Sequence, residues 1–186
     1  MEALLISTGI VALAEIGDKT QLLALVLAAR FKKPWPIVAG ILVATLANHA
    51  IAGAVGAWIT QQLGADVMRW ILGLSFLAMA VWMLIPDKID EDEKKEAPRH
   101  GVFLTTVILF FLLEIGDKTQ VATVALAARF SELAMVVAGT TLGMMLANAP
   151  VVFFGDALAK KVPLKLVHTL TALIFAGLGV LALVSR

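Results

Sequence analysis

The chain has 186 residues, of which 60% are hydrophobic and 16% are charged, and its formal net charge is +1. A soluble domain of this length could not bury so much apolar surface, so the composition indicates an integral membrane protein. The near-zero charge gives no electrostatic argument for nucleic-acid binding, and the absence of cysteine excludes disulfides, thiolate metal sites and thiol redox chemistry. No basic segment precedes the first apolar run, so we expect no cleaved signal peptide.

Six segments are apolar over about 20 residues, the length that a transmembrane helix needs. In chain order they are 4–29, 36–60, 68–86, 102–128, 133–156 and 164–184. Breakers separate them, for example Lys32, Lys33 and Pro34 after the first. Their apolar runs are continuous rather than alternating, which favours helices over strands. The sequence therefore predicts an all-α membrane protein with six transmembrane helices.

One long polar stretch, from Asp87 to His100, carries six acidic and four basic residues. Such a block of charges is typical of a solvated segment. We interpret it as a cytoplasmic linker that divides the chain into a first three-helix repeat (1–86), the linker (87–101) and a second three-helix repeat (102–186).

The two halves share a repeated motif. The heptapeptide Glu-Ile-Gly-Asp-Lys-Thr-Gln occurs at 15–21 and again at 114–120, and a Leu-Ala-Asn triplet occurs at 46–48 and again at 146–148. An odd number of spans in each half makes the second half enter the membrane from the opposite side. The pattern therefore predicts two inverted repeats that meet at one site.

Positive charges outside the spans predict the orientation. The six spans divide these charges between the two sides of the membrane. One side has ten, namely Arg30, Lys32, Lys33, Lys88, Lys94, Lys95, Arg99, Lys160, Lys161 and Lys165, and the other has three, namely Arg69, Arg129 and Arg186. The larger group should be cytoplasmic, which places both termini outside.

The motifs put charges at membrane depth, where they are expensive and usually functional. In a continuous helix Glu15, Asp18 and Lys19 would share a face, because residues three and four apart are neighbours. The second copy would do the same. Gly17 and Gly116 weaken the helix, and local unwinding there would free backbone carbonyls to line a cavity.

Inverted symmetry would bring the two copies together near the midplane as a set of oxygen ligands. Carboxylate, amide and hydroxyl oxygens suit Mg²⁺, Ca²⁺ or Mn²⁺, whereas Zn²⁺ or Cu⁺ would prefer His or Cys. The candidate metal-binding residues are Glu15, Asp18, Glu114, Asp117, Thr20, Gln21, Thr119, Gln120, Asn48 and Asn148. The roles of three neighbours stay open: Met144 and Met145 could favour Mn²⁺ through a thioether or serve only packing, and His49 could touch the site or join two helices.

Lys19 and Lys118 have two possible roles. They could lower the charge of the whole site from four negative to about two negative, or each could only neutralise the glutamate four residues before it. In either case, crowded carboxylates in a low-dielectric layer share bound protons. Such a site could hold protons or a divalent cation, which suffices for cation/proton exchange by alternating access.

The doubled Glu-x-Gly-Asp-Lys-Thr motif in a chain of six spans resembles the family of small cation/proton exchangers that includes Golgi calcium and manganese transporters. Among bacterial members it is most similar to manganese exporters of the MneA type. The resemblance covers nearly the whole chain. It implies that Glu15, Asp18, Glu114 and Asp117 bind the metal, that Mn²⁺ or Ca²⁺ moves against protons, and that the protein lies in a bacterial plasma membrane.

Functions other than Mn²⁺ export fit the sequence less well. The same fold could carry Ca²⁺ or a small organic cation, although the motifs contain no aromatic residue for an organic cation. An intramembrane enzyme with paired acids would need two acids in different environments, whereas the duplication is nearly perfect. A scaffold would leave the buried acids unexplained. We therefore expect a transporter, not an enzyme, with no cofactor, no nucleic-acid partner and an oligomeric state that the sequence does not decide.

Overall fold

In this computed structural model, residues 1–85, 101–155 and 163–184 are described, and every regular element within them is a helix. The helices are α1 (Glu2–Glu15), α2 (Lys19–Phe31), α3 (Pro34–Gln62), α4 (Ala65–Trp82), α5 (Gly101–Glu114), α6 (Lys118–Arg129), α7 (Leu133–Phe154) and α9 (Leu164–Val184). The all-α prediction is confirmed. The predicted linker, except Gly101, lies outside the described residues, as do Lys160, Lys161 and Arg186.

Two predicted spans are wrong as continuous helices. Segment 4–29 is divided into α1 and α2, and segment 102–128 is divided into α5 and α6. The physical reason is the same in both, because Gly17 and Gly116 adopt positive φ angles of 82° and 76°, which no right-handed helix contains. The predicted common helix face of Glu15, Asp18 and Lys19 is therefore also wrong.

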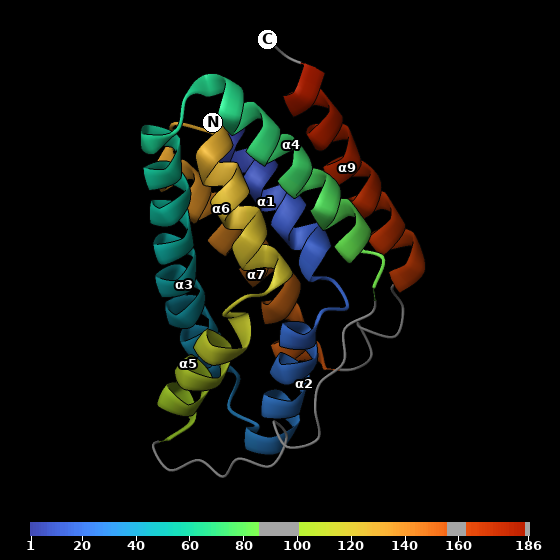
Figure 1. Cartoon of the computed structure of the whole chain (residues 1–186). Coiled ribbons are helices and arrows are strands. Elements are labelled where there is room, and N and C mark those ends of the chain that lie inside the picture. The colour runs from blue at the N-terminus through green and yellow to red at the C-terminus, as the bar shows by residue number, and fades with distance from the viewer. Residues whose placement is uncertain (86–100, 156–162, 185–186) are drawn as a thin grey trace.

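Three of the described helices are long and apolar enough to cross a membrane, namely α3, α7 and α9. The prediction of six crossings goes further than this and stays a prediction. The two divided segments consist of shorter helices that follow one another along the molecule, α1 before α2 and α5 before α6 (Figure 1).

Each pair of short helices packs against one long helix from the other half of the chain. Helix α7 contacts both α1 and α2, while α3 contacts both α5 and α6, and α3 and α7 also contact each other. Each break thus lies beside a continuous helix, α7 for the first break and α3 for the second. The N-terminus of α1 and the C-terminus of α9 lie at the same end of the molecule (Figure 1).

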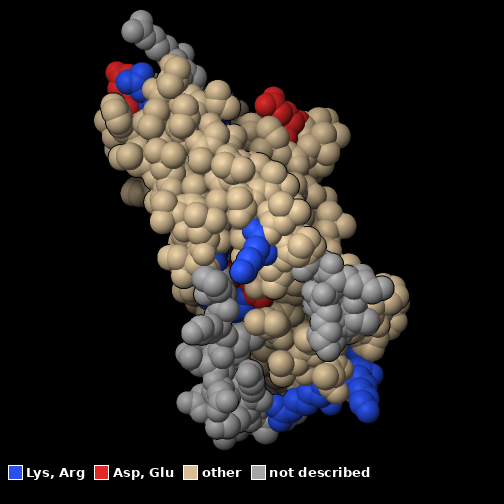
Figure 2. All heavy atoms as spheres, turned by 90° about the vertical axis from the view of Figure 1, so that its right-hand side faces the viewer, with Lys and Arg blue, Asp and Glu red and all other residues tan. Residues whose placement is uncertain are grey.

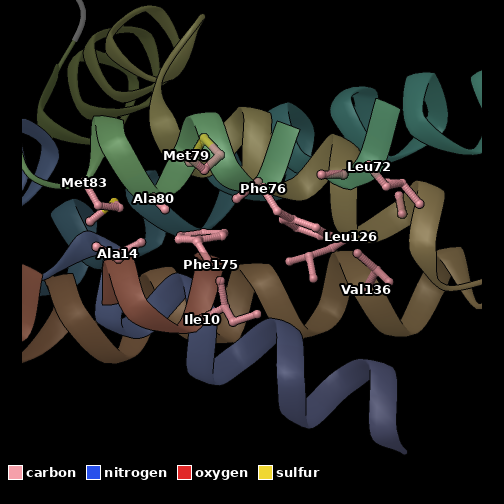
Figure 3. Close-up of a cluster of buried hydrophobic side chains, with 14 of the residues drawn as sticks. Ile10, Ala14, Leu72, Phe76, Met79, Ala80, Met83, Leu126, Val136 and Phe175 are labelled. Atoms are coloured by element: carbon pink, nitrogen blue, oxygen red, sulfur yellow. The ribbon is translucent and has the colours of Figure 1, made fainter. Parts of the chain in front are cut away.

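A hydrophobic core joins α1, α4, α6 and α9 (Figure 3). Its centre holds Phe76 of α4 and Phe175 of α9, whose ring centroids lie 6.1 Å apart, with Ile10 and Leu126 beside them. Because α4 and α9 pack along each other, they form one unit next to the divided helices.

The outer surface of α9 is apolar. Leu166, Leu173 and Leu181 are each about two-thirds exposed, at 66%, 65% and 64%. In Figure 2 the upper part of this side is free of charge, between the charges at its upper end and a group of Lys or Arg and Asp or Glu atoms near mid-height. Exposed leucines in such a continuous surface are expected where lipid, rather than water, is the neighbour.

Candidate cation site

The two heptapeptides fold into nearly identical helix breaks. After each positive-φ glycine, the aspartate is extended and begins the next helix, with φ and ψ of −78° and 167° at Asp18 and −80° and 166° at Asp117. The Asp18 amide donates to the Glu15 carbonyl and the Asp117 amide to the Glu114 carbonyl, both at 3.1 Å. Each aspartate therefore lies at a helix N-terminus, where the helix dipole favours negative charge.

A glutamine closes each break. Gln21 Oε1 accepts a hydrogen bond from the Gly17 amide at 2.9 Å, and Gln120 Oε1 accepts one from the Gly116 amide at 2.7 Å. The amide groups also tie the breaks to the long helices, because Gln21 Nε2 donates to the Ala147 carbonyl at 3.0 Å and Gln120 Nε2 donates to Asn48 Oδ1. Both glutamine oxygens are thus engaged by the backbone in this conformation.

The lysines join the two motifs to each other. Lys19 Nζ lies 3.4 Å from Asp117 Oδ1, and Lys118 Nζ lies 3.8 Å from Asp18 Oδ1. Both aspartates and Lys118 are at most 2% exposed, whereas the Lys19 side chain is 22% exposed. The suggestion that each lysine neutralises its own glutamate at i+4 is wrong, because the helix break turns each lysine toward the other repeat.

The two glutamates have different neighbours. Glu15 Oε1 accepts a hydrogen bond from Asn148 Nδ2 at 3.2 Å, whereas Glu114 Oε1 accepts one from Thr119 Oγ1 at 2.5 Å. Glu114 Oε1 also lies 3.6 Å from Nε2 of the fully buried His49. The structure therefore places His49 at the second motif, as one of the two sequence interpretations expected.

Asn48 and Asn148 lie at the two breaks but bond differently. Asn48 Nδ2 donates to the Phe111 carbonyl at 3.3 Å and its oxygen accepts from Gln120, whereas Asn148 reaches a carboxylate. Several buried oxygens find no hydrogen-bond partner among the described residues, and those at the two breaks include Thr20 Oγ1, Glu114 Oε2, Asp117 Oδ2 and Asn148 Oδ1. Buried acceptors without donors are costly, and an ion is one group that can satisfy them.

In the part of the chain that the structure describes, no three His, Asp or Glu side chains form a group that could hold one metal ion. In this conformation the acids are held by lysines, an amide and a hydroxyl. The single four-carboxylate cage therefore stays a prediction, as do the ligand roles of the threonines, glutamines and asparagines.

Helix α9 covers the first break, through a residue whose role the sequence did not indicate. His168 Nε2 lies 3.0 Å from the Ile16 carbonyl oxygen, a backbone group that the break exposes. The sequence could not predict this contact, because no spacing in the chain relates α9 to the first motif.

We expect Gly17→Ala to lower the thermal midpoint in detergent more than Gly116→Ala. Both alanines would have a positive φ, which costs about 1–2 kcal/mol. At position 17 the new Cβ would also lie 2.7 Å from Leu164 Cδ2 and 3.2 Å from His168 Nε2, whereas at 116 it meets no described atom within 4 Å. Gly9→Ala, inside α1 and with open space around it, is the control and should not lower the midpoint. Equal losses at 17 and 116 would contradict the proposed role of α9 as a cover.

One family model and several known proteins are similar to this chain. The family model described as "Divalent cation/proton antiporter GDT1" matches residues 3–91 and 102–186. A protein of Vibrio cholerae named "Putative manganese exporter" is 52% identical over 176 residues, which covers 94% of this chain and 87% of that protein. A "GDT1-like protein 3" of Oryza sativa subsp. japonica is 28% identical over 205 residues (96% and 72%), and a GDT1-like protein of Synechocystis is 28% identical over 184 residues (89% of each). No solved structure matches the chain.

Proposed function

This chain belongs to the GDT1 family of divalent cation/proton antiporters, a family of transporters and not of enzymes, and from that membership we propose that it exports Mn²⁺ from the cytosol in exchange for protons. The cargo is taken from the name of the Vibrio cholerae relative. Proton exchange is the activity in the family's description.

One observation carries the proposal: the two acidic motifs, far apart in sequence, meet through two reciprocal lysine–aspartate pairs. Lys19 reaches Asp117 and Lys118 reaches Asp18. If the four carboxylates and the two ammonium groups share one site, its formal charge is about two negative, by simple pairing. That charge is balanced by one divalent cation or by two protons, which is the condition for exchanging one for the other.

We assign cation binding and proton carriage to Glu15, Asp18, Glu114 and Asp117. For a cation to enter, Lys19 and Lys118 must release the aspartates that they hold, so the lysines keep the site closed in the absence of cargo. Thr20, Thr119, Asn48 and Asn148 would add neutral oxygens. Gln21 and Gln120 would contribute oxygens only after they release the glycine amides.

We further propose that the chain crosses the membrane six times as two inverted three-helix repeats. In this arrangement α1 with α2, and α5 with α6, each make one divided crossing, in the way that discontinuous helices form midplane sites in other transporters. The end that carries Lys32 and Lys33 would face the cytoplasm of a bacterial cell, with both termini outside. Rocking of the repeats around the fixed site would give alternating access.

The proposal is tested with purified protein in liposomes that contain a Mn²⁺-sensitive dye. An imposed pH gradient should drive Mn²⁺ movement against the proton flow, and an ionophore that collapses the gradient should stop it. Parallel vesicles with Ca²⁺ measure the alternative cargo. Mn²⁺ movement that ignores the pH gradient would overturn the exchange mechanism, and faster movement of Ca²⁺ than of Mn²⁺ would replace the cargo.

A further inference from the structure

We propose that the thioether of Met144 selects the cargo at this site, favouring softer divalent cations such as Mn²⁺ and Cd²⁺ over Ca²⁺ and Mg²⁺. The inference rests on the proposed function, because it concerns the choice among cations at the same site.

The sulfur of Met144 lies at the first motif. Met144 is fully buried in α7, one turn before Asn148. Its Sδ lies 2.9 Å from Asn148 Nδ2, and the same nitrogen lies 3.2 Å from Glu15 Oε1. The Met144 sulfur and the Glu15 carboxylate therefore both lie next to the side-chain amide of Asn148.

The Asn148 amide is the group that a cation would reorganise. Its Nδ2 faces three acceptors, namely Glu15 Oε1, Met144 Sδ and the Met144 carbonyl at 3.1 Å. An amide nitrogen carries two hydrogens, so these three acceptors cannot all be fully satisfied. The Asn148 oxygen meanwhile is buried without a hydrogen-bond partner among the described residues. Half a turn of the amide would point this oxygen at the same place, so that oxygen and sulfur donors converge on a cation.

The repeat does not require sulfur here. At the offset that relates Asn48 to Asn148, the residue matching Met144 is Ala44. Ala44 is also buried, so this position of the fold accepts a small side chain in the first half. The thioether is thus an addition to one half-site, next to Glu15, whereas Glu114 has His49 as its neighbour.

Softness decides which cations gain from the sulfur. Ca²⁺ and Mg²⁺ are hard ions that prefer oxygen ligands, and a thioether replaces an oxygen poorly for them. The polarisable sulfur suits soft ions such as Cd²⁺ strongly, and it suits Mn²⁺ only weakly, because Mn²⁺ is softer than Ca²⁺ but also prefers oxygen ligands. Because Cd²⁺ and Ca²⁺ have the same charge and similar size, their comparison isolates the sulfur from the dimensions of the site.

The test is Met144→Leu in the full chain, with Mn²⁺ transport in liposomes competed by Cd²⁺ or Ca²⁺. Leucine keeps the apolar volume, a type of exchange that usually costs less than about 1.5 kcal/mol. We expect the apparent affinity for Cd²⁺ to fall about tenfold, that for Mn²⁺ to fall by a smaller factor, and that for Ca²⁺ to change less than about twofold. Uniform changes for all three cations would overturn the inference.

Met145→Leu is the matched control. Met145 is the next residue of α7 and packs against the apolar cluster to which Met144 belongs, so its loss tests packing without removing the sulfur beside Asn148. It should leave the Cd²⁺ to Ca²⁺ ratio unchanged, and a ratio that falls equally in both variants would assign the effect to packing.

A binding measurement separates this inference from the proposed function. Cadmium NMR of the purified protein reports sulfur ligation directly, so the wild-type signal should lie downfield of the Met144→Leu signal even if no proton-coupled transport is found. Coincident signals would remove Met144 as a ligand. If Glu15→Gln abolishes transport while Met144→Leu leaves the cation ratios unchanged, the proposed site stands and the selectivity inference falls.

Discussion

Replacing Glu15 or Glu114 by glutamine is expected to lower pH-driven Mn²⁺ transport by at least about 100-fold while the protein stays folded. Replacing a residue that only supports a metal ligand typically lowers metal affinity or activity about 10–100-fold, and loss of a ligand charge should cost no less. Either change would also alter the charge balance of the site from about two negative to about one negative. A divalent cation would then no longer be fully balanced.

Glutamine is the informative replacement because it keeps the local hydrogen bonds. Its amide oxygen can still accept from Asn148 Nδ2 at position 15 and from Thr119 Oγ1 at position 114. A loss of transport without loss of thermal stability therefore reports the charge and not the packing. Liposome transport and the thermal midpoint in detergent are the two measurements.

Glu132→Gln is the control for these variants. Glu132 precedes α7, its side chain is 56% exposed, and its carboxylate lies 3.7 Å from the N-terminal amine. Transport should be unchanged, since exposed ion pairs contribute little. Undiminished Mn²⁺ transport by both Glu15→Gln and Glu114→Gln, at normal levels of folded protein, would remove the role assigned to the carboxylates.

The repeated motif predicted a good part of the site. Because the heptapeptide is identical at 15–21 and 114–120, the same local physics acts twice, and both copies form the same glycine break with the same extended aspartate. The glycines also indicated where local unwinding would occur. Apolar run lengths predicted α3, α7 and α9 to within two residues at each end.

The partners within the site could not be predicted from spacing. The rule that residues three and four apart share a face holds only in a continuous helix. Once Gly17 and Gly116 interrupt the helices, the lysines leave their own glutamates and reach the opposite aspartates. Tertiary packing sets these contacts, because α3 and α7 hold the breaks of opposite halves together.

The sequence repeat also could not predict that the two motifs have different surroundings. His168 and Leu164 of α9 lie against the first break. Near the second break, Lys118 Nζ donates to the Ile85 carbonyl after α4 at 3.1 Å. Among the described residues, neither contact has a counterpart at equal spacing in the other half. An argument from internal symmetry therefore predicts equivalent surroundings for the two breaks, whereas the fold gives them different ones.

The reciprocal lysine–aspartate pairs lead to a second large effect, on stability rather than transport. We expect Lys118→Met to destabilise the protein by about 3 kcal/mol, because Asp18 would be left as a buried charge without this ammonium partner. Lys19→Met should cost less than about 1 kcal/mol, since the Lys19 side chain is partly exposed and water can replace it at Asp117. For a chain of this size the larger loss corresponds to a fall of about 6–12 °C in the thermal midpoint.

A double variant decides whether the buried charge is the cause. In Lys118→Met with Asp18→Asn, both members of the pair are neutral, so most of the lost stability should return even though a proposed ligand is gone. The matched pair Lys19→Met with Asp117→Asn should show little such recovery, because little was lost. If Lys118→Met remains equally unstable with and without Asp18→Asn, the loss comes from the packing of the lysine chain or from its hydrogen bond to the Ile85 carbonyl. The cross-repeat pair would then not be what holds the two motifs together.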